Sequence, residues 1–409
     1  MKHQLEKYAQ VILKAGVNLQ TNQTLVISSP LECAPFTRIL SEAAYREGAR
    51  DVVINWVDEL SAKIRYVHGP DEIFDEFPAW RREFYLTYLH RNAAFISISA
   101  ADPELLKDVA SDRIVRTQKA SAAALKEYRE KTMNNEVSWC VVSIPTASWA
   151  AKVFPHASSN EAIDRLWDAI FQAARVTVPD PIAEWTAHKN RLSQYSAFLN
   201  AKSFQYLHYA NNLGTDLTVE LPPGHIWTGG ADTNAQGIDF IANMPTEEVY
   251  TLPLKTGVNG TVVSSKPLVY NGNLIDHFSL TFKDGKVIDY SAAKGYDMLE
   301  KLLQTDEGSS YLGEVALVPF DSPISNSGIL FYNTLFDENA SCHFAFGKAY
   351  PTCLKDGASL SQEQLAANGV NDSLIHVDFM IGTADLAITG ITPAGEKIPV
   401  FANGNFVPL

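Results

Sequence analysis

Short apolar runs alternate with helical patterns through the first half of the chain. Between those runs, residues 34–49 and 117–131 place apolar side chains at helical spacing. The runs themselves are short and rich in apolar residues, which is typical of strands buried on both faces. They lie at residues 24–29, 51–57, 93–99 and 139–145. This alternation predicts a parallel, Rossmann-like sheet with helices on its faces, which is an α/β fold.

The pattern changes near residue 202, where β-rich runs separated by Gly, Pro and Asn replace the helical spacing. The pair Asp284-Gly285 predicts a hairpin turn, and residues 392–401 suggest another. The β-rich runs lie at 217–224, 251–263, 277–291 and 314–320. We therefore expect an N-terminal α/β domain at residues 1–200 and a C-terminal, mostly antiparallel β (α+β) domain at residues 201–409.

The composition argues against several classes of partner. A chain of 409 residues is long enough for two domains, and its 46% hydrophobic and 20% charged residues are typical of a globular protein. The formal net charge of -14 argues against a nucleic-acid or anionic membrane surface. The N-terminal stretch lacks the apolar core of a signal peptide, and no run of about 18 apolar residues occurs. We expect no membrane span and a cytoplasmic location.

The chain lacks the motifs of nucleotide-binding and zinc-knot proteins. Neither GxGxxG nor GxxxxGK[ST] follows a predicted strand, so we interpret the first sheet as a scaffold. The four cysteines form no CxxC pair, and each lies among apolar neighbours. We expect reduced, buried thiols in a reducing compartment.

The first candidate for chemistry is the predicted strand at residues 373–382. Successive side chains of a strand point to opposite faces, so Ile375, Val377 and Phe379 form an apolar face. His376 and Asp378 then project together from the other face, where they could hold one divalent ion or orient one another. A solvent-facing strand with two incidental polar residues remains the alternative.

Carboxylates occupy two further predicted strands. Glu314 lies at the start of an apolar strand, on the face opposite Val315. Glu247 and Glu248 are adjacent, so in an extended segment one could enter a site while the other meets solvent or an arginine. Either feature alone is also common on a protein surface.

Glu338 and His343 lie in the stretch 337–350, where the apolar residues Ala340 and 344–346 predict a buried segment. Buried polar groups there must be paired or ligated, because an unsatisfied one costs a few kcal/mol. Imidazole and carboxylate ligands without thiolate favour a hydrolytic zinc, cobalt or manganese site over a structural one. The motif HExxH is absent, so such a site must combine distant segments.

Four motifs of the second half together resemble the aminopeptidase T family of metallopeptidases, which includes the AmpS- and PepS-type aminopeptidases of Gram-positive bacteria. They are NMPTEEVYTLP (243–253), YLGEVALVP (311–319), FDENASCHFAFGKAY (336–350) and HVDFMIG (376–382). The resemblance extends over the whole chain, although its specific motifs all lie in the second half.

The resemblance implies an aminopeptidase with two divalent metal ions, for which Co²⁺, Zn²⁺ and Mg²⁺ are all candidates. It also implies a two-domain subunit that forms a homodimer around an internal cavity and acts on peptides with a free N-terminus. Glu338 would be a further ligand or a base, and Tyr350 an active-site tyrosine. The implied metal ligands are Glu248, Glu314, His343, His376 and Asp378.

On this hypothesis, a water that two metal ions activate attacks the first peptide carbonyl. We expect Glu314 to bridge the ions, Tyr350 to stabilise the oxyanion, and Glu338 or Glu247 to shuttle the proton. Two alternatives stay open: another dinuclear metallohydrolase, such as an amidase, and a two-lobed protein that binds a small molecule.

Overall fold

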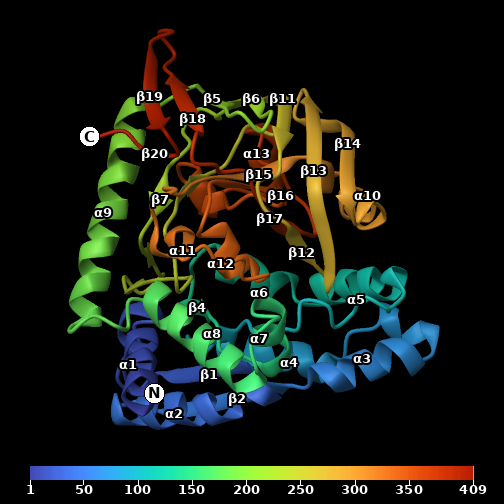
Figure 1. The fold of residues 1–409 in the computed structure, drawn as a ribbon, viewed down its shortest axis with the longest axis vertical. Helices are drawn as coiled ribbons and strands as arrows, with labels where there is room; N and C mark the ends of the chain where they lie inside the picture. Colours follow the sequence, from blue (N-terminus) through green and yellow to red (C-terminus); the bar gives the residue numbers. More distant parts are fainter. Residues whose placement is uncertain (409) are drawn as a thin grey trace. The chain divides into compact units, whose positions relative to one another are not determined.

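The computed structural model describes residues 1–408 of the chain. Internal contacts divide it into two compact units, which we call unit 1 and unit 2, and each is built from segments distant in sequence (Figure 1). Unit 1 comprises Met1–Lys189, Ala231–Thr246 and Leu330–Leu335. Unit 2 comprises Asn190–Gly230, Glu247–Ile329 and the chain from Phe336 onward. The single boundary near residue 200 stays a prediction.

Unit 1 contains a four-stranded parallel sheet in the order β2-β1-β3-β4. Its strands are β1 (Thr24–Pro30), β2 (Asp51–Val57), β3 (Ala94–Ile98) and β4 (Trp139–Val142). These strands coincide with the four apolar runs of the first half, which confirms the predicted parallel sheet. The pair β8 (Asp232–Thr233) and β9 (Asp239–Phe240) forms a separate small ladder.

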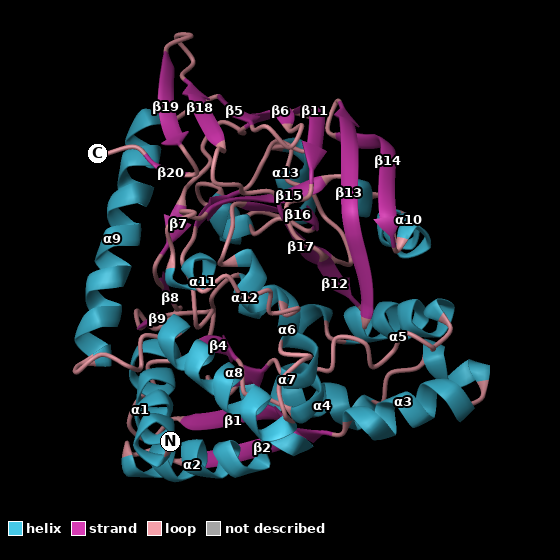
Figure 2. Ribbon diagram, viewed as in Figure 1, coloured by secondary structure: helices cyan, strands magenta, loops and turns pink. Residues whose placement is uncertain are grey.

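Helices account for most of the remainder of unit 1 (Figure 2). In α8, for example, Leu166, Ile170 and Phe171 are buried at helical spacing. The ring of Tyr8 in α1 lies 6.1 Å from that of Phe171 and 5.4 Å from that of Phe36 in α2. The helices are α1 (Lys2–Val11), α2 (Ala34–Arg46), α3 (Glu59–His68), α4 (Ala79–Leu89), α5 (Ser111–Ala124), α6 (Lys126–Met133), α7 (Ala147–Val153), α8 (Ser159–Ala173) and α9 (Pro181–Lys202), the last of which continues into unit 2.

Unit 2 contains two antiparallel sheets. The five-stranded sheet has the order β17-β16-β15-β10-β7, and its strands are β7 (Thr228–Gly229), β10 (Val249–Thr251), β15 (Leu312–Leu317), β16 (His343–Gly347) and β17 (His376–Met380). The nine-stranded sheet has the order β12-β13-β11-β6-β5-β18-β19-β20, with β14 paired to β13. Its strands are β5 (Tyr206–Ala210), β6 (Asp216–Glu220), β11 (Val258–Val263), β12 (Leu268–Tyr270), β13 (Asn273–Lys283), β14 (Lys286–Lys294), β18 (Ala387–Ile391), β19 (Lys397–Ala402) and β20 (Asn405–Phe406). The short helices α10 (Tyr296–Leu303), α11 (Pro323–Asn326), α12 (Thr334–Glu338) and α13 (Gln362–Ala367) connect strands, and α12 begins in unit 1.

The main core of unit 2 joins the two sheets. Aromatic pairs cross between the sheets: Tyr209 of β5 packs on Phe344 of β16, and Phe278 of β13 packs on Phe379 of β17. One face of the five-stranded sheet is therefore committed to the core, which leaves its other face for polar groups.

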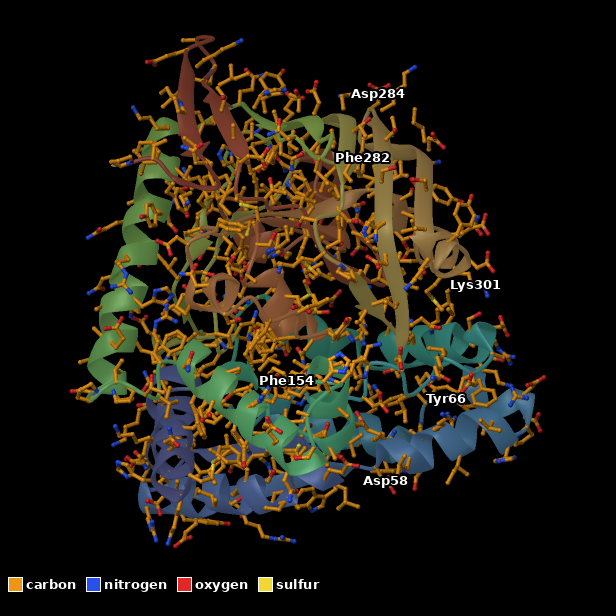
Figure 3. All side chains as sticks on the ribbon, in the orientation of Figure 1. Asp58, Tyr66, Phe154, Phe282, Asp284 and Lys301 are labelled. Carbon is orange, nitrogen blue, oxygen red and sulfur yellow. The ribbon has the colours of Figure 1, made fainter. Side chains whose placement is uncertain are left out.

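The predicted hairpin turn joins β13 and β14, where Figure 3 labels Asp284 at the turn and Phe282 on the strand. Asp284 and Gly285 both have positive φ, 49° and 80°, as a two-residue hairpin turn of type I′ requires. No helix in the described part of the chain is both long enough and apolar enough to cross a membrane.

Candidate metal centre

Strand register places four of the predicted residues on one face of the five-stranded sheet. Side chains of paired residues in an antiparallel ladder share a face. Ala345 of β16 pairs with both Glu314 of β15 and Asp378 of β17. His343 lies two residues from Ala345, and His376 lies two residues from Asp378, so both share that face. We call this surface the site face.

Glu248 joins the site face from the segment just before β10. Tyr250 pairs with Ala316, which lies on the site face, and Glu248 lies two residues before Tyr250. The opposite face carries Val315 and Phe344, which belong to the core. Five carboxylate and imidazole side chains from four segments therefore converge on one side of the sheet.

Distances within the site face define two groups that share one carboxylate. The Nε2 atom of His343 lies 3.1 Å from Glu248 Oε2 and 3.8 Å from Glu314 Oε1. The Nε2 atom of His376 lies 3.1 Å from Glu314 Oε2 and 3.4 Å from Asp378 Oδ1. Ligand atoms of Glu248, Glu314 and His343 all lie within 4.8 Å of one another, as do those of Glu314, His376 and Asp378. Each oxygen of Glu314 thus faces a different histidine.

Main-chain carbonyls orient both imidazoles. The Nδ1 atom of His343 donates to the Ser341 carbonyl at 3.0 Å, and that of His376 donates to the Lys348 carbonyl at 2.7 Å. A hydrogen bond at Nδ1 fixes the ring and directs Nε2 toward the carboxylates, which is the arrangement of metal-binding histidines.

Burial strongly perturbs the titration of these groups. Burial alone would lower the pKa of His343, but the hydrogen bond and charge of Glu248 raise it to about 10. Burial raises the pKa of Glu314, although the hydrogen bond from His376 opposes this shift. Ionised carboxylates in such a setting need cationic partners, because an uncompensated buried charge is very costly.

Glu338 and Tyr350 border the two groups. Glu338 ends α12 and is 7% exposed, and burial followed by repulsion from Asp378 raises its pKa well above the ordinary value. The Tyr350 ring packs edge-on against His376 with 5.0 Å between centroids. Burial, then the charge of Glu314, raises the pKa of Tyr350 well above its ordinary value, so its O–H remains a hydrogen-bond donor.

The donor set fits divalent metal ions. Four carboxyl groups and two imidazoles, without thiolate, suit zinc, cobalt, manganese or magnesium. With both histidines neutral, as metal binding requires, the ionised carboxylates of Glu248, Glu314 and Asp378 leave the cluster negatively charged. Divalent cations would offset this charge, and Glu314 offers one oxygen to each group.

Some residues of the site escaped the sequence analysis. Asn339 is fully buried; its Oδ1 accepts the Glu247 N–H at 2.8 Å, and its Nδ2 donates to Glu338 Oε1 at 3.3 Å. Only its position next to Glu338 in the sequence could have pointed to a role for Asn339 in the site. Nothing in the sequence could have pointed to the carbonyls of Ser341 and Lys348, because every residue has a carbonyl. The sequence analysis allowed one of the two adjacent glutamates to meet solvent. Glu247 does not, because it is buried.

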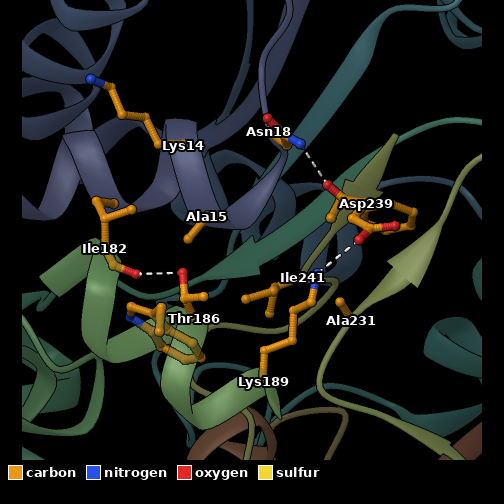
Figure 4. A pocket seen from close by; sticks show the side chains of 11 residues that line it. Lys14, Ala15, Asn18, Ile182, Thr186, Lys189, Ala231, Asp239 and Ile241 are labelled. Carbon is orange, nitrogen blue, oxygen red and sulfur yellow. Dashed lines mark hydrogen bonds and ion pairs between the residues drawn. The ribbon is translucent and has the colours of Figure 1, made fainter. Parts of the chain in front are cut away.

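Unit 1 contains a cavity of about 130 Å³, and no residue of the site face lines it (Figure 4). Asp239 is the one acid among its lining residues, and its Oδ2 pairs with Lys189 Nζ at 2.8 Å. Asn18 donates to the Asp239 carbonyl at 2.8 Å. This cavity therefore offers no second metal-binding group.

Comparisons with known proteins agree with the chemistry of the site face. The family profile described as thermophilic metalloprotease (M29) matches residues 1–406. Aminopeptidase 2 of Geobacillus stearothermophilus is 51% identical over 403 residues, which is 98% of this chain and 97% of the relative. Aminopeptidase AmpS of Bacillus subtilis is 48% identical over 98% of both chains. The solved structure of wild-type AmpT from Thermus thermophilus superposes with a TM-score of 0.92 at 40% identity and covers 100% of both chains.

Proposed function

The chain belongs to the thermophilic metalloprotease (M29) family and is a metallopeptidase, and from that premise we propose that it removes N-terminal residues from peptides by using two divalent metal ions. The relatives named above are aminopeptidases, and the similarity covers nearly the whole of each chain. This similarity supports the same activity here.

The observation that supports two ions is the position of Glu314 between the two groups. Glu248 and His343 with one oxygen of Glu314 would hold the first ion. His376 and Asp378 with the other oxygen would hold the second. Divalent ions held by these residues would lower the pKa of a bound water toward neutrality and would polarise a carbonyl. Reconstitution of the metal-free protein with Co²⁺, Zn²⁺ or Mg²⁺ would identify the metal that supports activity.

We assign Tyr350 and Glu338 to the peptide and its protons. The raised pKa of Tyr350 keeps its O–H available to donate to the oxygen on which negative charge develops. The raised pKa of Glu338 favours its protonated form, and a protonated carboxyl here could deliver a proton to the leaving amine. A direct ligand role for Glu338 is the competing assignment.

The test of the aminopeptidase assignment is the requirement for a free α-amino group. Matched peptides with free and N-acetylated ends should be offered to the metal-loaded protein, with N-terminal cleavage followed by mass spectrometry. We expect cleavage of the free peptides alone. Equal cleavage of both would refute the assignment and favour an amidase, and cleavage of neither would favour a protein that only binds its ligand.

The proposal extends to the assembly and the location of the protein. We propose a homodimer, because α3 has no buried residue and presents a stripe of exposed apolar side chains that a partner could cover: Leu60, Ile64 and Val67. We propose a cytoplasmic location, since all four cysteines are free and buried and a reducing compartment keeps thiols free.

A further inference from the structure

Strand β15 carries one residue more than its partner needs. Leu312 pairs with Phe346, whereas Glu314, two residues on, pairs with Ala345, only one residue along β16. Gly313 is the extra residue of this β-bulge. Leu312 and Val315 both lie in the core, and Glu314 between them lies on the site face.

The position of a side chain at residue 313 is occupied by two main-chain carbonyl groups. A methyl group on Gly313 would lie 2.5 Å from the carbonyl oxygen of Lys348 and closer still to that of Gly347. Both distances are far inside van der Waals contact. The backbone at Gly313 does not have the positive φ that favours glycine, so close approach is what requires a glycine here.

One of these carbonyls performs a task in the candidate metal centre. The Lys348 carbonyl accepts the Nδ1 hydrogen of His376 at 2.7 Å. The neighbouring Gly347 carbonyl accepts from Asn371 Nδ2 at 2.7 Å, and the same nitrogen donates to the Gly308 carbonyl at 2.8 Å. Asn371 is buried, and its two hydrogen bonds link the end of β16 to Gly308.

We propose that Gly313 is a positioning residue for metal binding: its missing side chain lets the Lys348 carbonyl reach His376 and direct Nε2 toward Glu314 and Asp378. This inference rests on the proposed two-metal function and deepens it. The bulge thereby places Glu314 and orients His376 through a single residue that has no side chain to bind a metal ion.

The test compares Gly313→Ala with Gly390→Ala. A methyl group on Gly390 of β18 would also overlap a neighbour, the ring of Phe204, but in the nine-stranded sheet. Zn²⁺ affinity is measured by chelator competition and thermal unfolding on metal-free protein. The Nδ1–H signal of His376 is followed by ¹⁵N NMR of the zinc-loaded protein.

We expect Gly313→Ala to weaken the affinity for one Zn²⁺ by about 10- to 100-fold and to lose or shift the His376 Nδ1–H signal, as loss of a histidine's supporting hydrogen bond does elsewhere. Gly390→Ala should lower the unfolding temperature while leaving the zinc affinity and that signal unchanged. Gly313→Ala could fail to fold, and Asn371→Ala then replaces it in the test. This second substitution removes the hydrogen bond to the Gly347 carbonyl, and we expect it to weaken the affinity for the same Zn²⁺ ion.

Wild-type zinc affinity and an unchanged His376 signal in Gly313→Ala, or in Asn371→Ala where the first variant does not fold, would overturn the inference and leave the two-metal function standing. Equal losses of zinc affinity in Gly313→Ala and Gly390→Ala would overturn it too, because the effect would then be general destabilisation. A wild-type protein that binds no zinc would instead refute the proposed function, so the two failures are distinguishable.

Discussion

At the scale of single residues, Glu314 has two oxygens that face different histidines, at 3.8 Å from His343 and 3.1 Å from His376. A shared carboxylate brings two cations close together, and this closeness distinguishes a dinuclear site from two independent ones. The proposed function divides the residues around it into metal ligands and groups that act on the peptide, and this division can be tested.

Tyr350→Phe tests the assignment of the phenol to the peptide. The substitution removes only the O–H group, so metal content should stay at the wild-type level. Loss of one oxyanion donor should lower kcat by about 10²- to 10³-fold. Metal analysis beside steady-state kinetics checks both, and metal loss in the variant would show that Tyr350 has a structural role instead.

Glu338→Gln separates the two assignments left open for that residue. Glutamine keeps the size of the side chain and can still accept from Asn339, but it cannot carry the proton. We expect kcat to fall by about 10²-fold or more while both metals stay bound. A variant that keeps its activity per bound metal but loses affinity for an ion would identify Glu338 as a ligand.

At the scale of elements, the two faces of β16 have different tasks, since Phe344 lies in the core and Ala345 lies between Glu314 and Asp378. Ala345→Val should therefore crowd the site face and weaken metal affinity by about 10-fold or more, the range seen when the groups around a metal are disturbed. Phe344→Leu, the matched change on the core face, should cost about 1 kcal/mol of stability and leave metal affinity unchanged. Chelator competition and denaturant unfolding measure the two effects, and a reversed pattern would contradict the assignment of the faces.

The same contrast shows what strand periodicity could predict. Alternation within one strand placed His376 and Asp378 together, and it separated Glu314 from Val315. It could not bring Glu314 to His376, because that proximity depends on the register between β15, β16 and β17. The bulge at Gly313 changes that register by one residue, and nothing in the local pattern of apolar residues marks a bulge.

At the scale of the whole molecule, the alternating runs predicted the parallel sheet of unit 1 and the β-rich character of unit 2. They could not predict that residues 231–246 and 330–335 belong to unit 1. Those segments are short, and their membership depends on tertiary contacts. The roles of Glu248 and Tyr350 rested on the family resemblance, because neither residue stands out by spacing alone.

The proposed homodimer gives a prediction at this scale. Light scattering during size-exclusion chromatography should report twice the 45.1 kDa mass of the chain. Leu60→Glu together with Ile64→Glu adds charge to the exposed stripe of α3 and should shift the protein to the monomer mass without loss of fold. A wild-type monomer would contradict the dimer, and a dimer that survives the double substitution would place the interface elsewhere.

The central claim, a pair of ions that share Glu314, is tested most directly by metal analysis of zinc-reconstituted protein and three variants. We expect about two zinc ions per chain in the wild type, about one in His343→Ala and in His376→Ala, and fewer than one in Glu314→Ala. A wild-type protein that binds a single ion, lost equally in both histidine variants, would contradict the account.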